Sequence, residues 1–202
     1  MIKTEISANE KEVFAIEKQD LILLRNYFSQ KNKIIVLSII NIGINVALRY
    51  SDLSQLCFED INKEGIVRVR EQKTKKIRDF KLNKVCLENL EKLKEFYIKQ
   101  NIPIEGFLFK SMNPYYRKHH IDKPLTLQSF NRYLRIARQD LSLSYRIGSH
   151  SLRKTWGYFY YEKTKDIAMI MKILNHSSVS MTLKYLGIDR QRIYDTYDTF
   201  LI

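Results

Sequence analysis

Four short stretches of this 202-residue chain carry residue types that can act on a phosphate group. In HSLRKT (150–155), His150 and Arg153 are three residues apart, so on a helix they share one face. A guanidinium suits a phosphate because its planar fork makes two parallel hydrogen bonds to phosphate oxygens, and a nearby imidazole can move a proton. A His-x-x-Arg pair alone is weak evidence, since such pairs usually lie on a solvated helix face.

The stretch ALRYSDL (47–53) adds a second arginine. Arg49 directly follows an apolar segment that we expect to be a buried helix, where a charge is costly unless it is paired. The simplest interpretation is an ion pair with Asp52, three residues further on. Asp52 can also orient Arg49 while the guanidinium faces a substrate.

The stretch LNHSSVSMTLKY (174–185) supplies a second imidazole, His176, and a phenol, Tyr185. Ser177 or Ser178 can cap a helix that carries Tyr185, which would lie close to the turn that presents His176. The chain has 13 tyrosines, so a lone tyrosine is more often a half-buried packing residue than a nucleophile. The fourth stretch, EQKTKK (71–76), adds amines.

The elements that must position these stretches are mostly helical. Residues 12–17 look extended, two apolar runs at 66–69 and 80–82 around a polar turn predict a hairpin, and 101–124 reads mainly as loop, with 106–109 (GFLF) as a short strand. Apolar periodicity predicts helices at 19–30, 150–162, 165–174, 178–187 and 189–200. Capping residues predict four more: from Asn32 to about 45, from Ser51 to about 57, from Asn83 through 97, and from Thr126 to about 139. The fold class is therefore mainly α with a small antiparallel β-sheet (α+β).

Charge narrows the class of partner. Lys and Arg number 35 against 22 acidic residues, a net charge of +13, which favours a polyanion: nucleic acid first, an anionic membrane surface second. The longest apolar stretch, 34–44, is too short to span a bilayer, and the N-terminus lacks an apolar signal core. Cys57 and Cys86 lack metal-site spacing and are interpreted as reduced core thiols.

Together the four stretches resemble the catalytic domain of the tyrosine recombinase (integrase) family. The family pattern is an arginine in a (G/A)LRxS(E/D)L box, a hairpin lysine, an HxLR box and an LGHSS…T…Y box, and this chain has all of them in that order. The separations also fit, with 26 residues from His150 to His176 and nine more to Tyr185. Several independent motifs in one order are far more specific than any of them alone.

The resemblance implies a role for each candidate residue. Tyr185 would attack a DNA phosphate, Asp52 would support the site, and Lys75, Lys76 and Lys154 would contact DNA. The phosphate-activating set would be Arg49, Lys73, His150, Arg153 and His176. His150 would act as general base and Lys73 as general acid for the leaving 5′ oxygen, with Lys75 and Lys76 as alternatives for the acid. All three hairpin lysines could instead touch only the DNA backbone.

Two departures from the family pattern accompany the match. Asn175 stands where the family usually has Gly, at a position that we expect to end a helix in the left-handed conformation, which Asn tolerates. Most members also carry an N-terminal DNA-clamping domain, whereas here about 17 residues precede the first catalytic helix. We divide the chain into an N-terminal extension (1–17), the catalytic domain (18–188) and a C-terminal helix or tail (189–202), which packs on its own domain or docks on a neighbouring subunit.

The resemblance also implies partners and surroundings. It implies double-stranded DNA as substrate, a homo-oligomer (tetramer) on that DNA, no membrane, and the bacterial cytoplasm in the service of a mobile element. It implies no cofactor and no metal, because the arginines supply the positive charge. Two other functions stay open: a type IB topoisomerase-like nicking and closing enzyme, and a catalytically inactive DNA-binding accessory factor.

Overall fold

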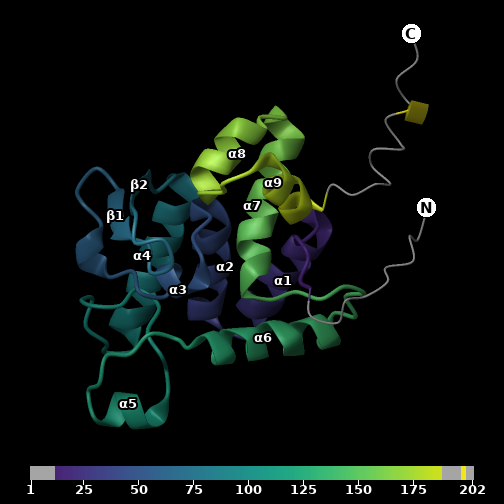
Figure 1. Ribbon diagram of the computed structural model, residues 1–202. Helices are drawn as coiled ribbons and strands as arrows, with labels where there is room; N and C mark the ends of the chain where they lie inside the picture. The colour runs from purple at the N-terminus through teal and green to yellow at the C-terminus, as the bar shows by residue number, and fades with distance from the viewer. Residues whose placement is uncertain (1–11, 188–196, 199–202) are drawn as a thin grey trace.

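The computed structural model describes residues 12–187 together with 197–198, and Figure 1 shows how the elements are arranged. The expected mainly helical fold with one small antiparallel sheet is confirmed. In chain order the elements are α1 (Lys18–Gln30), α2 (Ile34–Val46), α3 (Tyr50–Leu53), η1 (Phe58–Asp60), β1 (Ile66–Arg70), β2 (Ile77–Lys81), α4 (Lys84–Lys99), α5 (Pro114–Lys118), α6 (Leu127–Asp140), α7 (Ser149–Thr164), α8 (Ile167–Leu174) and α9 (Val179–Leu186).

Helix α2 forms the centre of the main core. It is apolar along almost its whole length and nearly all of its side chains are buried, with α4 and α7 packed against it (Figure 1). Gly43 permits the close approach of its neighbours, because a Cβ there would lie 2.8 Å from the side chains of both Leu53 and Leu152. The C-terminal end of α2 is therefore held tightly between α3 and α7.

The hairpin β1–β2 pairs in the register Val67 with Phe80 and Val69 with Arg78. Because side chains alternate between the two faces of a strand, Val67 and Val69 point inward. The next inward position after Val69 is Glu71, at the start of the turn. The hairpin thus carries a carboxylate and a guanidinium on the face that looks toward the helices.

A second, smaller apolar cluster joins the last three helices of the described chain. It is built on Ala47, Ile170, Leu174 and Leu186, with Tyr185 among the half-buried residues packed against it. Gly157 of α7 lets α9 come close, since a Cβ there would lie 3.0 Å from Leu186. This cluster fixes α9 against α7, and Ala47 connects it to the end of α2.

Three expected helix caps are confirmed. The side chains of Asn83, Thr126 and Ser178 accept hydrogen bonds from backbone N–H groups in the first turns of α4, α6 and α9. Of the two serines considered for α9, Ser178 is the cap.

The free thiols of Cys57 and Cys86 also agree with the expectation, although only Cys86 is buried.

Two other cap predictions were wrong. Asn32 does not begin α2: it adopts a left-handed conformation (φ 50°) and ends α1, where the Lys33 N–H donates to the Phe28 carbonyl at 2.8 Å. Ser51 lies inside α3, whose N-cap is Arg49, and that helix ends at Leu53 rather than near Cys57.

The loop region also differs from expectation in two places. Residues 106–109 form no strand; Phe107 makes only an isolated bridge with Cys57. The short helix α5 was missed, although Asn113 followed by Pro114 is a good helix start, with a capping side chain and a proline in the first turn.

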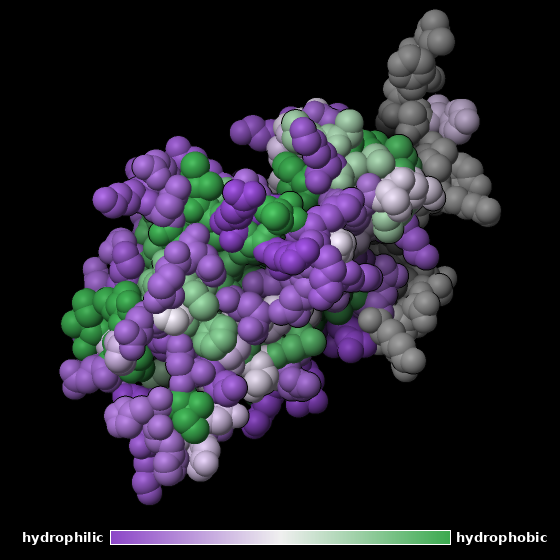
Figure 2. All heavy atoms as spheres, turned by 60° about the vertical axis from the view of Figure 1, so that its left-hand side comes forward, coloured by the Kyte–Doolittle hydropathy of each residue, from purple (hydrophilic) through white to green (hydrophobic). Residues whose placement is uncertain are grey.

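The hairpin side of the molecule is turned forward in Figure 2. Hydrophilic side chains cover most of that face, and apolar ones gather in separate patches.

No helix in the described part of the chain is long and apolar enough to cross a membrane. The expected helix at 189–200 lies outside the described residues apart from its positions 197–198.

Candidate active site

Two arginines converge on the C-terminal end of α2. The Arg153 guanidinium donates to the carbonyl of Ala47 at 2.7 Å and to the carbonyl of Leu174, and Arg78 donates to the carbonyl of Val46 at 2.6 Å. The last carbonyls of a helix have no partner within it and carry partial negative charge, so they are natural acceptors for cations. Arg153 is only 2% exposed, and its burial lowers the pKa of the guanidinium below the usual value.

Arg49 forms its ion pair with the hairpin and not, as expected, with Asp52. Its Nη1 lies 3.0 Å from Oε2 of Glu71, a carboxylate that is 1% exposed. Arg49 is the N-cap of α3 and has an extended backbone, outside the helix that contains Asp52. Asp52 accepts instead from the backbone N–H of Gln72 at 2.8 Å, so it supports the site by holding the hairpin turn.

Glu71 is the acceptor at the centre of this charge network. Its carboxylate receives hydrogen bonds from Thr74 at 2.7 Å and Asn175 at 3.4 Å besides Arg49, and Arg78 lies 3.9 Å away. Burial opposes ionisation, but the two hydrogen bonds and the charges of Arg49 and Arg153 outweigh it and hold the pKa of Glu71 below its usual range. Glu71 is therefore a buried anion that organises cations from three parts of the chain.

His176 and Tyr185 face each other across the turn between α8 and α9. Their rings meet edge-on, with centroids 5.0 Å apart. The Nδ1 atom of His176 lies 3.0 Å from the hydroxyl oxygen of Thr182, a fully buried residue one turn before Tyr185. Burial, then the charges of Arg153 and Arg49, lower the pKa of His176 to about 4, so its imidazole is neutral at physiological pH.

The Tyr185 hydroxyl is buried close to the Arg153 guanidinium, but no group in the described part of the chain meets hydrogen-bond geometry with it. Burial raises its pKa to about 12, and this rise is opposed by the nearby guanidiniums of Arg153 and Arg49. A buried, unsatisfied polar group is uncommon in folded proteins and is often found where a substrate completes the hydrogen bonding. The phenol thus lies beside two cations without a partner of its own.

His150 and Lys73 complete the group from the exposed side. His150 lies at the start of α7, where burial and then the charges of Arg153, Arg49, Lys154 and Lys73 lower its pKa. Lys73 lies in the hairpin turn and is exposed. The structure therefore brings all six sequence-predicted catalytic candidates into one electrostatic neighbourhood.

The other predicted lysines differ in their surroundings. Lys75 is exposed and has a left-handed backbone (φ 59°), and Lys76 donates to the Asn175 side chain at 3.2 Å. Lys154 pairs with Glu12 at 2.9 Å and its side chain is only 13% exposed, with its ammonium 5.6 Å from the centre of the Tyr185 ring. Lys154 is thus less available to a DNA backbone than the other two.

Sequence reasoning missed two residues of this network, Glu71 and Arg78. The signal for Glu71 was present, because it continues the inward alternation of Val67 and Val69. Arg78 stands opposite Val69 in the register, which places it on the same face. Its lowered pKa, about 10, follows from burial first and from the neighbouring Arg153 charge next.

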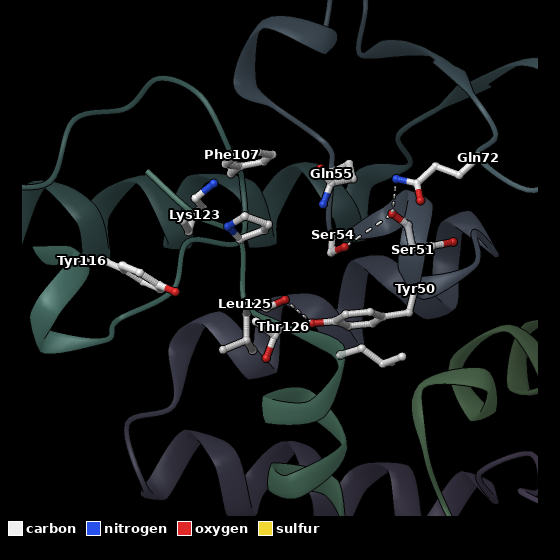
Figure 3. A pocket seen from close by; sticks show the side chains of 12 residues that line it. Tyr50, Ser51, Ser54, Gln55, Gln72, Phe107, Tyr116, Lys123, Leu125 and Thr126 are labelled. Carbon is white, nitrogen blue, oxygen red and sulfur yellow. Dashed lines mark hydrogen bonds between the residues drawn. The ribbon is translucent and has the colours of Figure 1, made fainter. Parts of the chain in front are cut away.

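A pocket of about 480 Å³ adjoins the site on the other side of α3 (Figure 3). Gln72 of the hairpin turn lines the pocket and donates to the Ser51 carbonyl, and Tyr50 donates to the carbonyl of Leu125. None of the candidate catalytic residues lines it. Within 12–187 and 197–198 no group of three or more His, Cys, Asp and Glu side chains is arranged to hold a metal ion.

A helical domain in which two arginines and a histidine lie beside a tyrosine, with a second histidine and a hairpin lysine near the same arginines, matches the catalytic domain of a tyrosine recombinase, a class of site-specific DNA recombinases. Residues 15–192 match the profile of the phage integrase family. The chain therefore belongs to the phage integrase family.

Individual relatives agree with this assignment. The chain is 38% identical over 177 residues to "Probable integrase/recombinase YoeC" of Bacillus subtilis (strain 168), covering 88% of this chain and 90% of that protein. It is 25% identical over 177 residues to "Probable integrase/recombinase" of Acholeplasma phage L2, covering 87% of this chain and 57% of the relative. Among solved structures, XerH site-specific recombinase bound to palindromic difH substrate superposes with a TM-score of 0.69 at 19% identity, covering 91% of this chain and 51% of XerH. This chain thus spans nearly all of YoeC but little more than half of the other two proteins.

Proposed function

We propose that this protein cleaves and rejoins DNA strands through a 3′-phosphotyrosine at Tyr185. The observation that carries the proposal is that Arg49, Arg153 and His176 lie around a buried phenol that lacks a hydrogen-bond partner, with His150 near the same two arginines. A phosphodiester bound between the two guanidiniums would receive positive charge and would offer the phenol an acceptor.

The first chemical step is attack of the Tyr185 oxygen on phosphorus. A phenol with a pKa of about 12 gives up its proton only with help, and His150, whose pKa is lowered, is neutral and able to take it. Negative charge grows on the non-bridging oxygens as the new bond forms, and Arg49 and Arg153 neutralise it. The guanidinium of Arg153 is already fixed on two carbonyls, so little reorganisation is needed during the step.

The second part of the step is departure of the 5′ oxygen. That oxygen leaves with the electron pair of its bond to phosphorus and takes a proton, which Lys73 supplies. His176 donates a hydrogen bond to a non-bridging oxygen, with its ring braced by Thr182. The phosphodiester energy stays in the phosphotyrosine linkage, so a 5′-hydroxyl of the same or a second strand can reverse the reaction without a further energy source.

Trapping the covalent adduct tests this function. The DNA site is not needed in advance if the protein is offered a pool of duplexes with randomised sequence, each nicked on one strand, so that the short 5′-hydroxyl fragment released by cleavage diffuses away. Adducts are isolated by denaturing precipitation of protein and the attached DNA is sequenced. Recovery of one sequence class with wild type and none with Tyr185→Phe is expected. Equal recovery with both proteins would overturn the proposal.

The alternative functions give different outcomes in two further assays. Relaxation of supercoiled plasmid without any sequence requirement would favour a topoisomerase-like enzyme, because that activity needs no exchange between duplexes. Unchanged function after Tyr185→Phe would favour an accessory DNA-binding factor. We expect neither: the arginines beside Tyr185 support a catalytic role over an accessory one, and the match of residues 15–192 to the phage integrase family supports recombination over simple relaxation.

We propose double-stranded DNA as the partner and a tetramer as the working assembly, in the bacterial cytoplasm. The excess of positive charge supports the first part, and the apolar spacing of Ile193, Tyr197 and Leu201 supports docking of the C-terminal segment on a neighbouring subunit. Light scattering of a chain truncated at Gly187, with and without DNA, tests the proposed docking of the C-terminal segment. A smaller assembly on DNA is expected, and an unchanged one would contradict docking in trans.

A further inference from the structure

Asn175 ends helix α8 in the left-handed conformation, with φ 52° and ψ 47°. Glycine adopts this conformation at no steric cost, and asparagine is one of the few other residues that tolerate it. The backbone geometry alone thus explains why the helix stops here. It does not explain why the position carries a carboxamide, and the contacts of that group point to a separate role.

The carboxamide of Asn175 forms two hydrogen bonds, one with a residue at each end of the hairpin turn. Its Nδ2 donates to the Glu71 carboxylate at 3.4 Å, and its Oδ1 accepts from the Lys76 ammonium at 3.2 Å. Glu71 and Lys76 themselves close the turn, since the Glu71 N–H donates to the Lys76 carbonyl at 2.9 Å. One side chain therefore holds the base of the loop that carries Lys73.

The same short segment of chain contacts the rest of the catalytic group. The carbonyl of Leu174, the residue before Asn175, accepts from Arg153, and the residue after it is His176. Through Glu71, the carboxamide also touches the network that fixes Arg49. Asn175 thus connects the hairpin to the turn that presents His176. Its hydrogen bond with Lys76 joins two residues that are 99 positions apart in the sequence.

We propose that Asn175 is a positioning residue for strand cleavage: its carboxamide clamps the Lys73-bearing hairpin turn against the α8–α9 turn that carries His176. This inference rests on the proposed function. The inference also gives the two lysines different roles: Lys76 is held by the clamp, while Lys73 stays free to reach the leaving oxygen. Asn175 would act through these two contacts and not on the phosphate itself.

Asn175→Gly separates this role from a role in ending the helix. Glycine keeps the left-handed turn and removes only the carboxamide, so a residue that merely ends the helix should tolerate the change or gain stability. If the clamp matters, the cleavage rate at saturating DNA should fall roughly tenfold, while the dissociation constant for DNA stays within about twofold. The matched control is Asn101→Gly, an exposed asparagine with φ 51° far from the site, for which no change is expected.

A change of leaving group shows whether the clamp acts through Lys73. A substrate with sulfur in place of the bridging 5′ oxygen releases a thiolate, which needs no proton donor because a thiol has a pKa of about 8.5. On this substrate the tenfold defect of Asn175→Gly should shrink to about twofold. A general loosening of the site would instead slow both substrates equally, and that result would overturn the proposal.

A double-variant cycle gives an independent test. Lys76→Met removes one partner of the clamp, so Asn175→Gly should cost much less in the Lys76→Met background than in wild type. Fully additive effects would overturn the proposal. Wild-type protein is the reference for the function itself: if it forms no adduct on a selected duplex, the proposed function fails, whereas a normal wild-type rate with an equally fast Asn175→Gly variant overturns the clamp alone.

Discussion

The rings of His176 and Tyr185 stand edge-on, with centroids 5.0 Å apart and planes inclined by 76°. Both residues belong to the small apolar region where α8 and α9 meet α7, and not to the main core around α2. The phenol of Tyr185 and the neighbouring imidazole are thus carried on one structural unit, while Arg49 and Lys73 are carried on another. Their relative position depends on the contacts between the two units.

His176 should be neutral in the free protein over the whole physiological range. Burial lowers the pKa of His176 to about 4, so we expect no titration of its imidazole between pH 5 and 8 in an NMR pH series. A bound DNA phosphate favours the charged form and should raise this pKa in the Tyr185→Phe complex. Titration of His176 near 6.5 without DNA would show that the ring is not buried as described.

Arg153 should be irreplaceable by lysine. Arg153→Lys keeps the charge but loses the planar fork that reaches both the Ala47 and Leu174 carbonyls. We expect a fall of about 10²–10³ in cleavage rate and a loss of about 1–3 kcal/mol in the free energy of unfolding, because buried acceptors lose their donor. Denaturant unfolding and single-turnover cleavage measure the two effects, and a lysine variant with near-wild-type values of both would refute this role.

Glu71 should contribute stability that depends on pH. Its folded-state pKa lies below the usual 4.5, so its contribution is fully present above pH 4.5 and is lost as the pH falls through the folded-state pKa. Glu71→Gln leaves Arg49 and Arg78 without their counter-ion and should cost about 1–3 kcal/mol at pH 7. Denaturant unfolding of both proteins at several pH values should show this difference narrowing as the pH falls below 4.5, and a constant difference would contradict the assignment.

Variants of the three hairpin lysines should differ in cleavage rate when the leaving group of the substrate is changed. We expect Lys73→Ala to lose most cleavage of a normal phosphodiester and to regain most of it on a substrate with a 5′ bridging sulfur, because that leaving group needs no proton. Lys75→Ala serves as the matched control from the same turn and should show no such rescue, whereas Lys76→Ala removes a partner of the Asn175 clamp and should show only a smaller defect with partial rescue. Rescue of Lys76→Ala alone would transfer the general-acid role to Lys76.

The sequence predicted which candidate residues lie near one another better than it predicted their partners. The four motifs located Arg49, His150, Arg153 and Tyr185, because residue type and order are visible in a sequence. The ion pair of Arg49 was assigned to Asp52, its neighbour in the chain, whereas its partner is Glu71, 22 residues away. Such a pairing depends on how the hairpin packs against α3, which local spacing does not encode.

Helix caps were harder to predict where the same residue type serves at both ends of a helix. Asn83 and Thr126 were identified correctly as caps because each is followed directly by an amphipathic pattern. Asn32 was misread because asparagine is common both at the start of a helix and in the left-handed residue after one. Only the backbone conformation, φ 50° for Asn32, separates these two uses.

Peptide mapping of the trapped DNA adduct tests the central claim most directly. Wild-type protein is incubated with a selected nicked duplex, denatured and digested, and the peptide that carries nucleotide is sequenced by mass spectrometry. The account predicts a 3′-phosphate ester on the oxygen of Tyr185 and no adduct with Tyr185→Phe. An adduct on any other residue, or one that persists in Tyr185→Phe, would contradict it.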